Sequence, residues 1–533
     1  RTGATIVATV RNALPDSTIS IHGLLARPAA TDDSIVLRPG ESRTVRFAAG
    51  APGTYLYAAM LGKRDFDNTD ETDAASGAIV VDPAGGSPPD RILMINIWGR
   101  TLDSTTYRNA LAINGKSWPW DERMQMTVGD TVRWRVINAS VRNHPMHLHG
   151  FFFDVTARGN QLADTLYAAG DRRSVVTEGM RAYTTMDMAF VPDRPGNWLF
   201  HCHIGFHVVP DARLDPPGPA DHDRMSDDPA VHMAGLVVGL TVRPRAGAAP
   251  PDRSAARRLR LYVDEGTRRG RARRALGFVL QQGDRPPAAD SLERSSSLLV
   301  LTRGEPTDIT VLNRLGESAA IHWHGVELES FSDGVPGWSG AGSAVAHMIP
   351  ARDSFVAHLT LPRAGTFMYH THLNDFEQLT SGLYGGIIVL EPGQRYDPAR
   401  DHIFVAGWDG AENRPPHLLV NGDSAPPPLV LAADVPHRFR FVNIGVAVRF
   451  RIAILRDSTI ERWRPLAKDG ADLPAARAVP GPAKHVIEVG ETFDAEFSSG
   501  PGEYRLVFST PAGTLYERRL IFTHAPDPND PRE

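Results

Sequence analysis

Hydrophobic and polar residues alternate in short runs along most of this chain, and turn-forming residues separate the runs. Residues 131–137 (Thr-Val-Arg-Trp-Arg-Val-Ile) and 437–442 (His-Arg-Phe-Arg-Phe-Val) are examples. Such period-two alternation predicts half-buried β-strands, and no long segment has the 3.6-residue period of an amphipathic helix. The 48 Gly and 42 Pro fit many turns between short strands. We therefore expect an all-β protein built from β-sandwich domains.

Length and composition narrow the class further. A chain of 533 residues is too long for one hydrophobic core and indicates about three to five domains. Apolar residues make up 42% and charged residues 22%, as in ordinary soluble proteins. The net charge of −5 gives no reason to expect a nucleic-acid partner. No apolar run approaches the length of a transmembrane helix, so we expect no membrane span.

Two internal repeats divide the chain. In the first, residues 1–84 resemble residues 258–393: the segment 52–60 (Pro-Gly-Thr-Tyr-Leu-Tyr-Ala-Ala-Met) parallels 364–372 (Ala-Gly-Thr-Phe-Met-Tyr-His-Thr-His). Likewise, 20–23 (Ser-Ile-His-Gly) parallels 322–325 (His-Trp-His-Gly). The first copy therefore has Ser, Ala and Met where the second has histidines.

The second repeat pairs residues 90–245 with residues 398–525. Here the segment 195–203 (Pro-Gly-Asn-Trp-Leu-Phe-His-Cys-His) parallels 501–509, and Phe508 stands at the position of Cys202. Residues 246–257 are rich in Ala, Gly and Pro and are interpreted as a linker. The repeats predict four modules, of which only 90–245 and 258–393 keep candidate metal ligands.

Those ligands are ten of the chain's 20 histidines and its only cysteine, gathered in four short clusters. The clusters are His144-Pro-Met-His147-Leu-His149, His201-Cys202-His203-Ile-Gly-Phe-His207, His322-Trp-His324 and His370-Thr-His372. Because side chains alternate along a strand, each His-X-His step places two imidazoles on the same face. A thiolate with histidine neighbours is a set that suits a blue copper electron-transfer site.

These motifs resemble those of the multicopper oxidases, which are built from cupredoxin β-sandwiches, and the best matches are laccase-like bacterial members. The resemblance implies four tandem cupredoxin-like Greek-key domains. It also implies four coppers per chain: one type 1, one type 2 and two type 3. By matching position the type 1 ligands are His144, Cys202 and His207, the type 2 ligands are His147 and His322, and the type 3 ligands are His149, His201, His203, His324, His370 and His372.

The order of the modules departs from three-domain laccases, since the Cys module here precedes the His-Trp-His module. We expect the trinuclear cluster between residues 90–245 and 258–393. Asp333 matches a family acid near the type 2 copper, with a simple turn Asp as the alternative. The axial type 1 ligand usually follows the Cys by ten residues, but Ala212 stands there. We therefore infer an Asp-rich insertion over residues 208–232 with Met233 as a weak axial ligand, or else a non-coordinating axial position.

The resemblance implies an enzyme that oxidises phenols or aromatic amines by one electron each and reduces O2 to water. The small-molecule reductant and O2 are then its partners. The alternative is a metallo-oxidase acting on Cu(I), Fe(II) or Mn(II). The Asp-rich insertion is interpreted either as a solvated Pro/Asp loop or as a lid that selects substrates or docks such a cation. A copper nitrite reductase needs only one three-His site beside type 1 copper, and a metal-free scaffold would not keep all ten histidines. We further expect a secreted or periplasmic bacterial protein whose signal peptide has been removed, as a monomer or small homo-oligomer.

Overall fold

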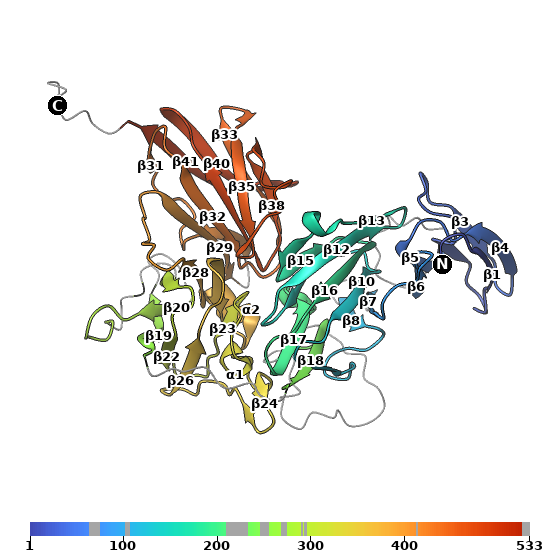
Figure 1. Cartoon of the computed structure of the whole chain (residues 1–533), viewed down its shortest axis with the longest axis horizontal. Helices are drawn as coiled ribbons and strands as arrows, with labels where there is room; N and C mark the ends of the chain where they lie inside the picture. Colours follow the sequence, from blue (N-terminus) through green and yellow to red (C-terminus); the bar gives the residue numbers. More distant parts are fainter. Residues whose placement is uncertain are drawn as a thin grey trace.

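The computed structural model describes residues 1–62, 75–101, 107–208, 233–245, 255–267, 274–288, 292, 296–411 and 414–524. Four β-sandwiches follow one another along the chain (Figure 1). We call them sandwich 1 (β1–β6), sandwich 2 (β7–β18), sandwich 3 (β19–β28) and sandwich 4 (β29–β41). The prediction of an all-β fold with four tandem sandwiches is confirmed. Most of the predicted linker lies outside the described residues, and the predicted domain bounds stay predictions.

Sandwich 1 is the smallest. A two-stranded sheet faces a four-stranded sheet of order β3-β2-β5-β6. Its strands are β1 (Thr5–Arg11), β2 (Ile19–His22), β3 (Ser34–Leu37), β4 (Ser42–Ala48), β5 (Gly53–Leu61) and β6 (Ala75–Val81).

Sandwich 2 has one sheet of order β13-β12-β16-β10-β7-β8, with β14 beside β12, and a second of order β15-β11-β17-β18-β9. The first sheet comprises β7 (Arg91–Thr101), β8 (Tyr107–Ile113), β10 (Val132–Asn138), β12 (Phe153–Asn160), β13 (Asp164–Leu166), β14 (Arg173–Val175) and β16 (Thr184–Phe190). The second comprises β9 (Met124–Thr127), β11 (His144–Leu148), β15 (Thr177–Met180), β17 (Gly196–Cys202) and β18 (Val237–Arg243). Two 3-10 turns, Ala169–Asp171 and Gly205–His207, complete it.

Sandwich 3 consists of two four-stranded sheets, β20-β19-β22-β26 and β21-β28-β27-β23. Their strands are β19 (Arg257–Thr267), β20 (Arg274–Leu280), β21 (Leu299–Thr302), β22 (Thr307–Asn313), β23 (His322–His324), β26 (Ser354–Leu359), β27 (Gly365–His370) and β28 (Tyr384–Leu390). Two short helices, α1 (Ser330–Asp333) and α2 (Asp375–Ser381), follow β23 and β27. A small hairpin, β24 (Gly340–Ala341) and β25 (Ala344–Val345), extends the second sheet of sandwich 2 by pairing Gly340 with Asn197.

Sandwich 4 has sheets of order β30-β29-β32-β39-β35-β36 and β31-β41-β40-β33-β34, with β37 beside β35 and β38 beside β33. The first sheet comprises β29 (Asp401–Ala411), β30 (Arg414–Val420), β32 (His437–Asn443), β35 (Arg462–Lys468), β36 (Ala471–Asp472), β37 (Gly481–Pro482) and β39 (Glu491–Phe497). The second comprises β31 (Leu429–Ala432), β33 (Phe450–Arg456), β34 (Thr459–Ile460), β38 (Lys484–Ile487), β40 (Gly502–Thr510) and β41 (Gly513–Thr523).

One contiguous apolar core runs through sandwiches 2 and 3, whereas sandwich 4 has a separate, aromatic-rich core. In the shared core Trp198, Phe200 and Cys202 come from one face of β17, because alternate residues of a strand share a face. The opposite face of β17, with His201, turns toward sandwich 3. The sheets of β11 and β17 and of β23 and β27, which hold the histidine clusters, thus pack around one shared core.

The two junctions within the repeats use the same contacts. Between sandwiches 1 and 2, Thr54 Oγ1 donates to Asp187 (2.6 Å) and accepts from Arg135 Nη1 (2.6 Å). Between sandwiches 3 and 4, the equivalent residues are Thr366, Asp494 and Arg440, with both distances at 2.8 Å. The two junctions therefore have the same arrangement of Thr, Asp and Arg side chains.

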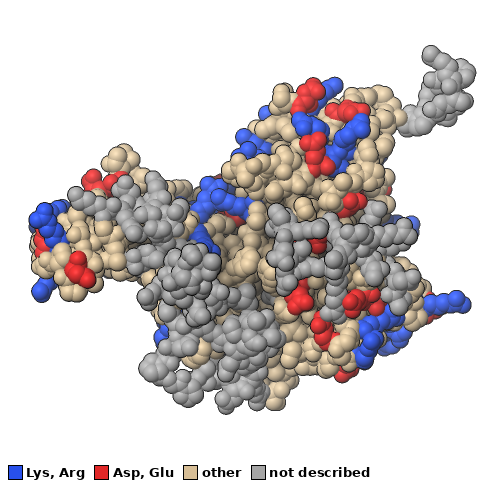
Figure 2. Space-filling view, turned by 180° about the vertical axis from the view of Figure 1, so that it is seen from behind, with Lys and Arg blue, Asp and Glu red and all other residues tan. Residues whose placement is uncertain are grey.

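The whole chain has a net charge of −5. On the face seen in Figure 2, acidic and basic side chains lie intermixed. On the described surface of this face they form no continuous basic patch of the kind that binds nucleic acid. Within the described residues, no helix has the length and apolar character needed to cross a membrane.

Candidate metal centre

Three donor atoms meet inside sandwich 2. Cys202 Sγ lies 3.3 Å from His207 Nδ1 and 3.6 Å from His144 Nδ1, and the two nitrogens are 3.1 Å apart. His144 begins β11, Cys202 ends the neighbouring β17, and His207 lies in the 3-10 turn that follows. All three are buried. The structure therefore brings together the three residues predicted to hold type 1 copper.

A hydrogen bond to the ring nitrogen remote from Cys202 fixes the orientation of His144. Ser140 Oγ donates its proton to Asn138 Oδ1 (2.8 Å), so it accepts from His144 Nε2 at 2.8 Å. Nδ1 of His144 is then the unprotonated nitrogen, with its lone pair turned toward Cys202. Such a hydrogen bond to the remote ring nitrogen is the usual way in which a protein orients a metal-binding imidazole.

Eight further histidines form a second group between sandwiches 2 and 3. Four come from β11 and β17 with the residues that follow them, and four come from β23 and β27 in the same way. They are His147, His149, His201, His203, His322, His324, His370 and His372, and all are buried. Register brings them together, because His147 pairs with His201 and His322 pairs with His370. Across the junction His147 stacks on His324 at 3.7 Å and His149 on His322 at 4.0 Å between ring centroids.

Within this group, donor atoms of several residue sets lie within 4.8 Å of one another. These sets are His203, His324 and His370; His147, His149 and His201; and His147, His322 and His324. His372 falls outside them, although its ring centroid lies 5.4 Å from that of His149 and 5.8 Å from that of His201. The structure thus gathers all eight predicted residues around one volume that spans the junction.

Backbone carbonyls set the tautomers of four of these rings. Nδ1 of each donates to a carbonyl oxygen: His147 to Val176 (3.0 Å), His201 to Cys202 (2.8 Å), His322 to Asp333 (2.9 Å) and His370 to Thr371 (2.6 Å). Their Nε2 atoms consequently carry lone pairs, and those of His147, His322 and His370 are buried without a hydrogen-bond partner in the described structure. Buried polar atoms rarely lack a hydrogen-bond partner. These three lone pairs are therefore suited to coordinate a metal ion.

Asp333 lies against this group at the end of α1. It is fully buried, accepts from His149 Nδ1 at 2.9 Å and from Ser339 Oγ at 2.9 Å, and lies 3.3 Å from His322 Nδ1. Asp333 therefore contacts one histidine from each sandwich, His149 through its carboxylate and His322 through its backbone carbonyl. The sequence-based placement of Asp333 beside the cluster agrees with this geometry, and the turn interpretation also holds, since Gly334 follows at φ 84°.

Burial favours the neutral form of His201, His207, His147 and His149. It lowers the pKa of His201 to about 4 and that of His207 to about 3, and neighbouring histidines lower the pKa of His147 and His149 further. The same desolvation raises the pKa of the Cys202 thiol. Ring nitrogens are thus available as ligands at neutral pH, while the thiol needs a bound cation to become a thiolate.

Sandwich 4 also contacts the histidine group, although the sequence predicted no role for it there. His324 Nε2 lies 2.8 Å from the carbonyl oxygen of Gly490. A Cβ at Gly490 would stand 2.7 Å from Cγ of His203, and the residue has φ +80°. Glycine is therefore required where β39 begins, because any side chain would collide with the histidine group.

The packing of Met233 bears on its predicted role as the axial ligand. Met233 packs with Leu199 and Val237, on the face of β17 and β18 opposite to Cys202. The residue on the Cys202 side is Leu236, which shares the core with Cys202 and whose carbonyl accepts from the Cys202 backbone N–H at 3.0 Å. This packing favours the alternative of a non-coordinating axial position, and the assignment of Met233 as axial ligand stays a prediction. Residues 209–232 of the predicted insertion lie outside the described residues.

Comparison with known proteins assigns the family. Residues 88–212 and 296–394 each match a sequence family described as multicopper oxidase. Copper resistance protein A of Escherichia coli is 38% identical over 120 residues, which is 22% of this chain and 18% of that protein. Laccase-1 of Cryptococcus neoformans is 26% identical over 245 residues, 38% of this chain and 36% of that protein. This chain therefore spans well under half the length of these relatives.

Among solved structures, a blue copper oxidase from Nitrosomonas europaea aligns with 50% of this chain and 86% of that chain, at 20% identity and a TM-score of 0.41. The two segments that carry the histidine clusters belong to the multicopper oxidase family. The family implies copper. The neutral imidazoles, the thiol and the unpartnered Nε2 atoms described above are donors that suit copper.

Proposed function

We propose that this protein is a laccase-like multicopper oxidase, which couples one-electron oxidation of small aromatic reductants to the four-electron reduction of O2 to water. The observation that carries the proposal is the pair of adjacent donor groups. One is a Cys-His-His group, and the other is an eight-histidine group that spans sandwiches 2 and 3. Cys202 belongs to the first group, while its chain neighbours His201 and His203 belong to the second.

In this proposal His144, Cys202 and His207 hold type 1 copper. The type 2 copper is held by His147 and His322. The two type 3 coppers are held by His149, His201, His203, His324, His370 and His372. When bound, type 1 copper accepts single electrons from the reductant, and the three-copper cluster passes four of them to O2. Leu236 shares the core with Cys202, so the type 1 copper would be held by His144, Cys202 and His207 alone, which would favour a higher reduction potential.

The chain's own residues perform three tasks in this reaction. The backbone from His201 to His203 forms a short covalent path between the two groups, so electrons need not cross solvent. Asp333 holds His149 and His322 in orientation and is positioned to pass protons toward the cluster. Burial of every donor excludes water from the site, so the imidazoles keep their lone pairs for the metal.

A metallo-oxidase acting on Cu(I) or Fe(II) is the second candidate. It is favoured by the similarity to copper resistance protein A and to an iron transport multicopper oxidase of Schizosaccharomyces pombe, which is 30% identical over 120 residues. A copper nitrite reductase is less well supported, because one type 2 copper would leave most of the eight histidines without a role. We also propose a secreted or periplasmic location and a monomer, since both halves of the cluster come from one chain.

A steady-state comparison separates the two candidates. The copper-loaded protein is supplied with a phenol, an aromatic amine, Cu(I) or Fe(II), while O2 uptake is recorded. The laccase-like proposal predicts that kcat/KM is highest for the phenol or amine, with four electrons consumed per O2. Uptake that is efficient only with a metal ion would favour the metallo-oxidase, and no uptake with any of them would refute both.

A further inference from the structure

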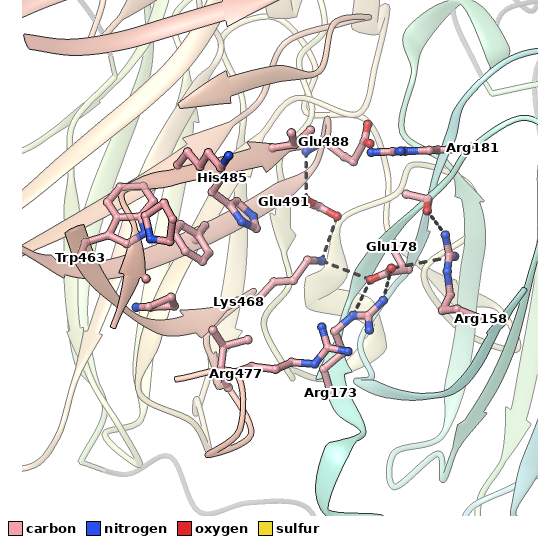
Figure 3. Close-up of a pocket in the computed structure, with 18 of the residues that line it drawn as sticks. Arg158, Arg173, Glu178, Arg181, Trp463, Lys468, Arg477, His485, Glu488 and Glu491 are labelled. Atoms are coloured by element: carbon pink, nitrogen blue, oxygen red, sulfur yellow. Dashed lines mark hydrogen bonds and ion pairs between the residues drawn. The ribbon is translucent and has the colours of Figure 1, made fainter. Parts of the chain in front are cut away.

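A cavity of about 660 Å³ lies between sandwiches 2 and 4, away from the histidine groups (Figure 3). Strands β12, β14 and β15 of sandwich 2 form one wall, and β35, β38 and β39 of sandwich 4 form the other. This volume is in the range of small-molecule sites, about 300–1,000 Å³. The two walls come from segments about 300 residues apart in the sequence, so the cavity is a product of the tertiary fold.

The lining carries an excess of positive charge. Six cationic residues line it, against three carboxylates. The cations are Arg158, Arg173, Arg181, Lys468, Arg477 and Lys484, and the carboxylates are Glu178, Glu488 and Glu491. A concave site with such an excess attracts anions, and both walls contribute to it.

The three carboxylates are already engaged. Glu178 pairs with Arg173, with Nε to Oε2 at 3.1 Å, and Glu491 pairs with Lys468 at 2.9 Å, as Figure 3 shows. Glu488 accepts from Asn143 at 2.7 Å. Each carboxylate of the lining therefore already has a partner, so the remaining cations of the lining are not neutralised by them.

Three cations remain available. Within the described part of the chain, no carboxylate lies within ion-pair distance of Arg181, Arg477 or Lys484, all of which are exposed. The guanidinium of Arg477 instead faces the ring of Tyr167 at 5.5 Å from the centroid. An arginine and a lysine without acidic partners at one cavity provide charge-assisted hydrogen bonds for a carboxylate.

Aromatic residues also line the cavity, beside glycines, prolines and two aliphatic residues. Trp463 is buried, and His485 stacks on Phe493 with 3.8 Å between ring centroids. Nε2 of His485 is buried and has no hydrogen-bond partner in the described structure, although the ring borders the cavity (Figure 3). An orphaned nitrogen beside a cavity indicates a site that a ligand or water completes.

We propose that this cavity binds an aromatic carboxylate, held by Arg477 and Lys484 against the aromatic residues of the lining. Arg477 and Lys484 belong to sandwich 4, and Arg181 in the wall formed by sandwich 2 is also without an ion pair in the described structure, so binding would join the two sandwiches. Two contacts connect the cavity to the metal centre. Lys468 Nζ, in the cavity lining, contacts the carbonyl oxygen of Thr177, and Thr177 Oγ1 lies 3.1 Å from His147 Nδ1. The inference does not depend on the proposed oxidase function.

Calorimetric titration of the copper-loaded protein with benzoate tests the proposal, since benzoate has no phenol to be oxidised. We expect one benzoate per chain and an increase in the Tm of the protein. The variants R477Q and K484Q should each weaken binding by about tenfold, as expected for loss of a charge-assisted hydrogen bond. Both positions are exposed, so these variants should fold, which far-UV circular dichroism and copper content would verify.

The matched control is R505Q, which removes an exposed arginine of the same sandwich that is paired with Glu517 at 3.1 Å. It should bind benzoate as the wild type does. Absence of benzoate binding would overturn the proposal, as would equal affinity in R477Q, K484Q and R505Q. Neutral benzamide binding as tightly as benzoate would overturn the anionic part, and inorganic sulfate binding as tightly would overturn the aromatic part.

Discussion

Replacing Asp333 with Asn gives a sharp test of how the second donor group is held. The substitution keeps the size of the side chain and the backbone carbonyl that accepts from His322. It removes the charge that accepts from His149 and Ser339, both at 2.9 Å in a fully buried site. A hydrogen bond to a charged group contributes about 1.5–3 kcal/mol. Loss of such an outer partner lowers metal affinity by about 10- to 100-fold.

The assay is copper retention. Wild type and D333N are dialysed against the same series of free copper concentrations, and bound copper per chain is measured. We expect D333N to lose copper at about 10- to 100-fold higher free concentration than the wild type, because His149 is no longer held by a charged acceptor. Unfolding of the metal-free proteins in urea should show a loss of about 1.5–3 kcal/mol.

The matched control is D308N, which breaks an Asp–His pair of the same kind. Asp308 accepts from His358 at 2.7 Å, but this pair is partly exposed, at 21% and 38%. Its loss should cost less than about 1 kcal/mol and leave copper retention unchanged. If D333N retained copper as the wild type does while D308N did so too, the role assigned to Asp333 would be refuted.

Three further changes test the surroundings of the site. G490A should weaken copper retention and lower stability by at least about 1–2 kcal/mol, because φ is +80° and the new methyl would meet the His203 ring; wild-type retention would contradict the steric argument. K468M should lower the free energy of unfolding by about 3–5 kcal/mol in urea, since it leaves the buried Asp469 and Glu491 without their cation, and a neutral effect would oppose this. Burial raises the pKa of Asp121 to about 7, so between about pH 4 and pH 7 the folded state keeps a proton that the unfolded state has released. The free energy of unfolding should therefore fall by up to about 4 kcal/mol as the pH rises across this range. In D121N this pH dependence should disappear.

Much of the site followed from local sequence. Alternation along a strand predicts that His201 and His203 share a face opposite to Cys202, and the structure agrees. The repeats predicted that the histidines come from the second and third modules, and the register of β11 with β17 and of β23 with β27 agrees. These features depend on period-two geometry within single strands, which a sequence records directly.

Features set by tertiary contacts could not be predicted. Met233 was chosen by its spacing from a family pattern, but Leu236 lies on the Cys202 side because it shares the face of Val238 in β18. The role of sandwich 4 was missed because its sequence has lost the ligands, whereas its backbone at Gly490 contacts His324. The cavity between sandwiches 2 and 4 depends likewise on packing between distant segments.

The most direct test of the central claim is to measure copper content and visible absorption together in the wild type and in C202S. The wild type should bind four coppers per chain and be intensely blue from the Cu–thiolate bond. C202S should bind three coppers, lose the blue colour and lose O2 uptake with every reductant. A colourless wild type with full copper, or a C202S variant that stays blue, would contradict the assignment of Cys202, His144 and His207 as the electron-entry site.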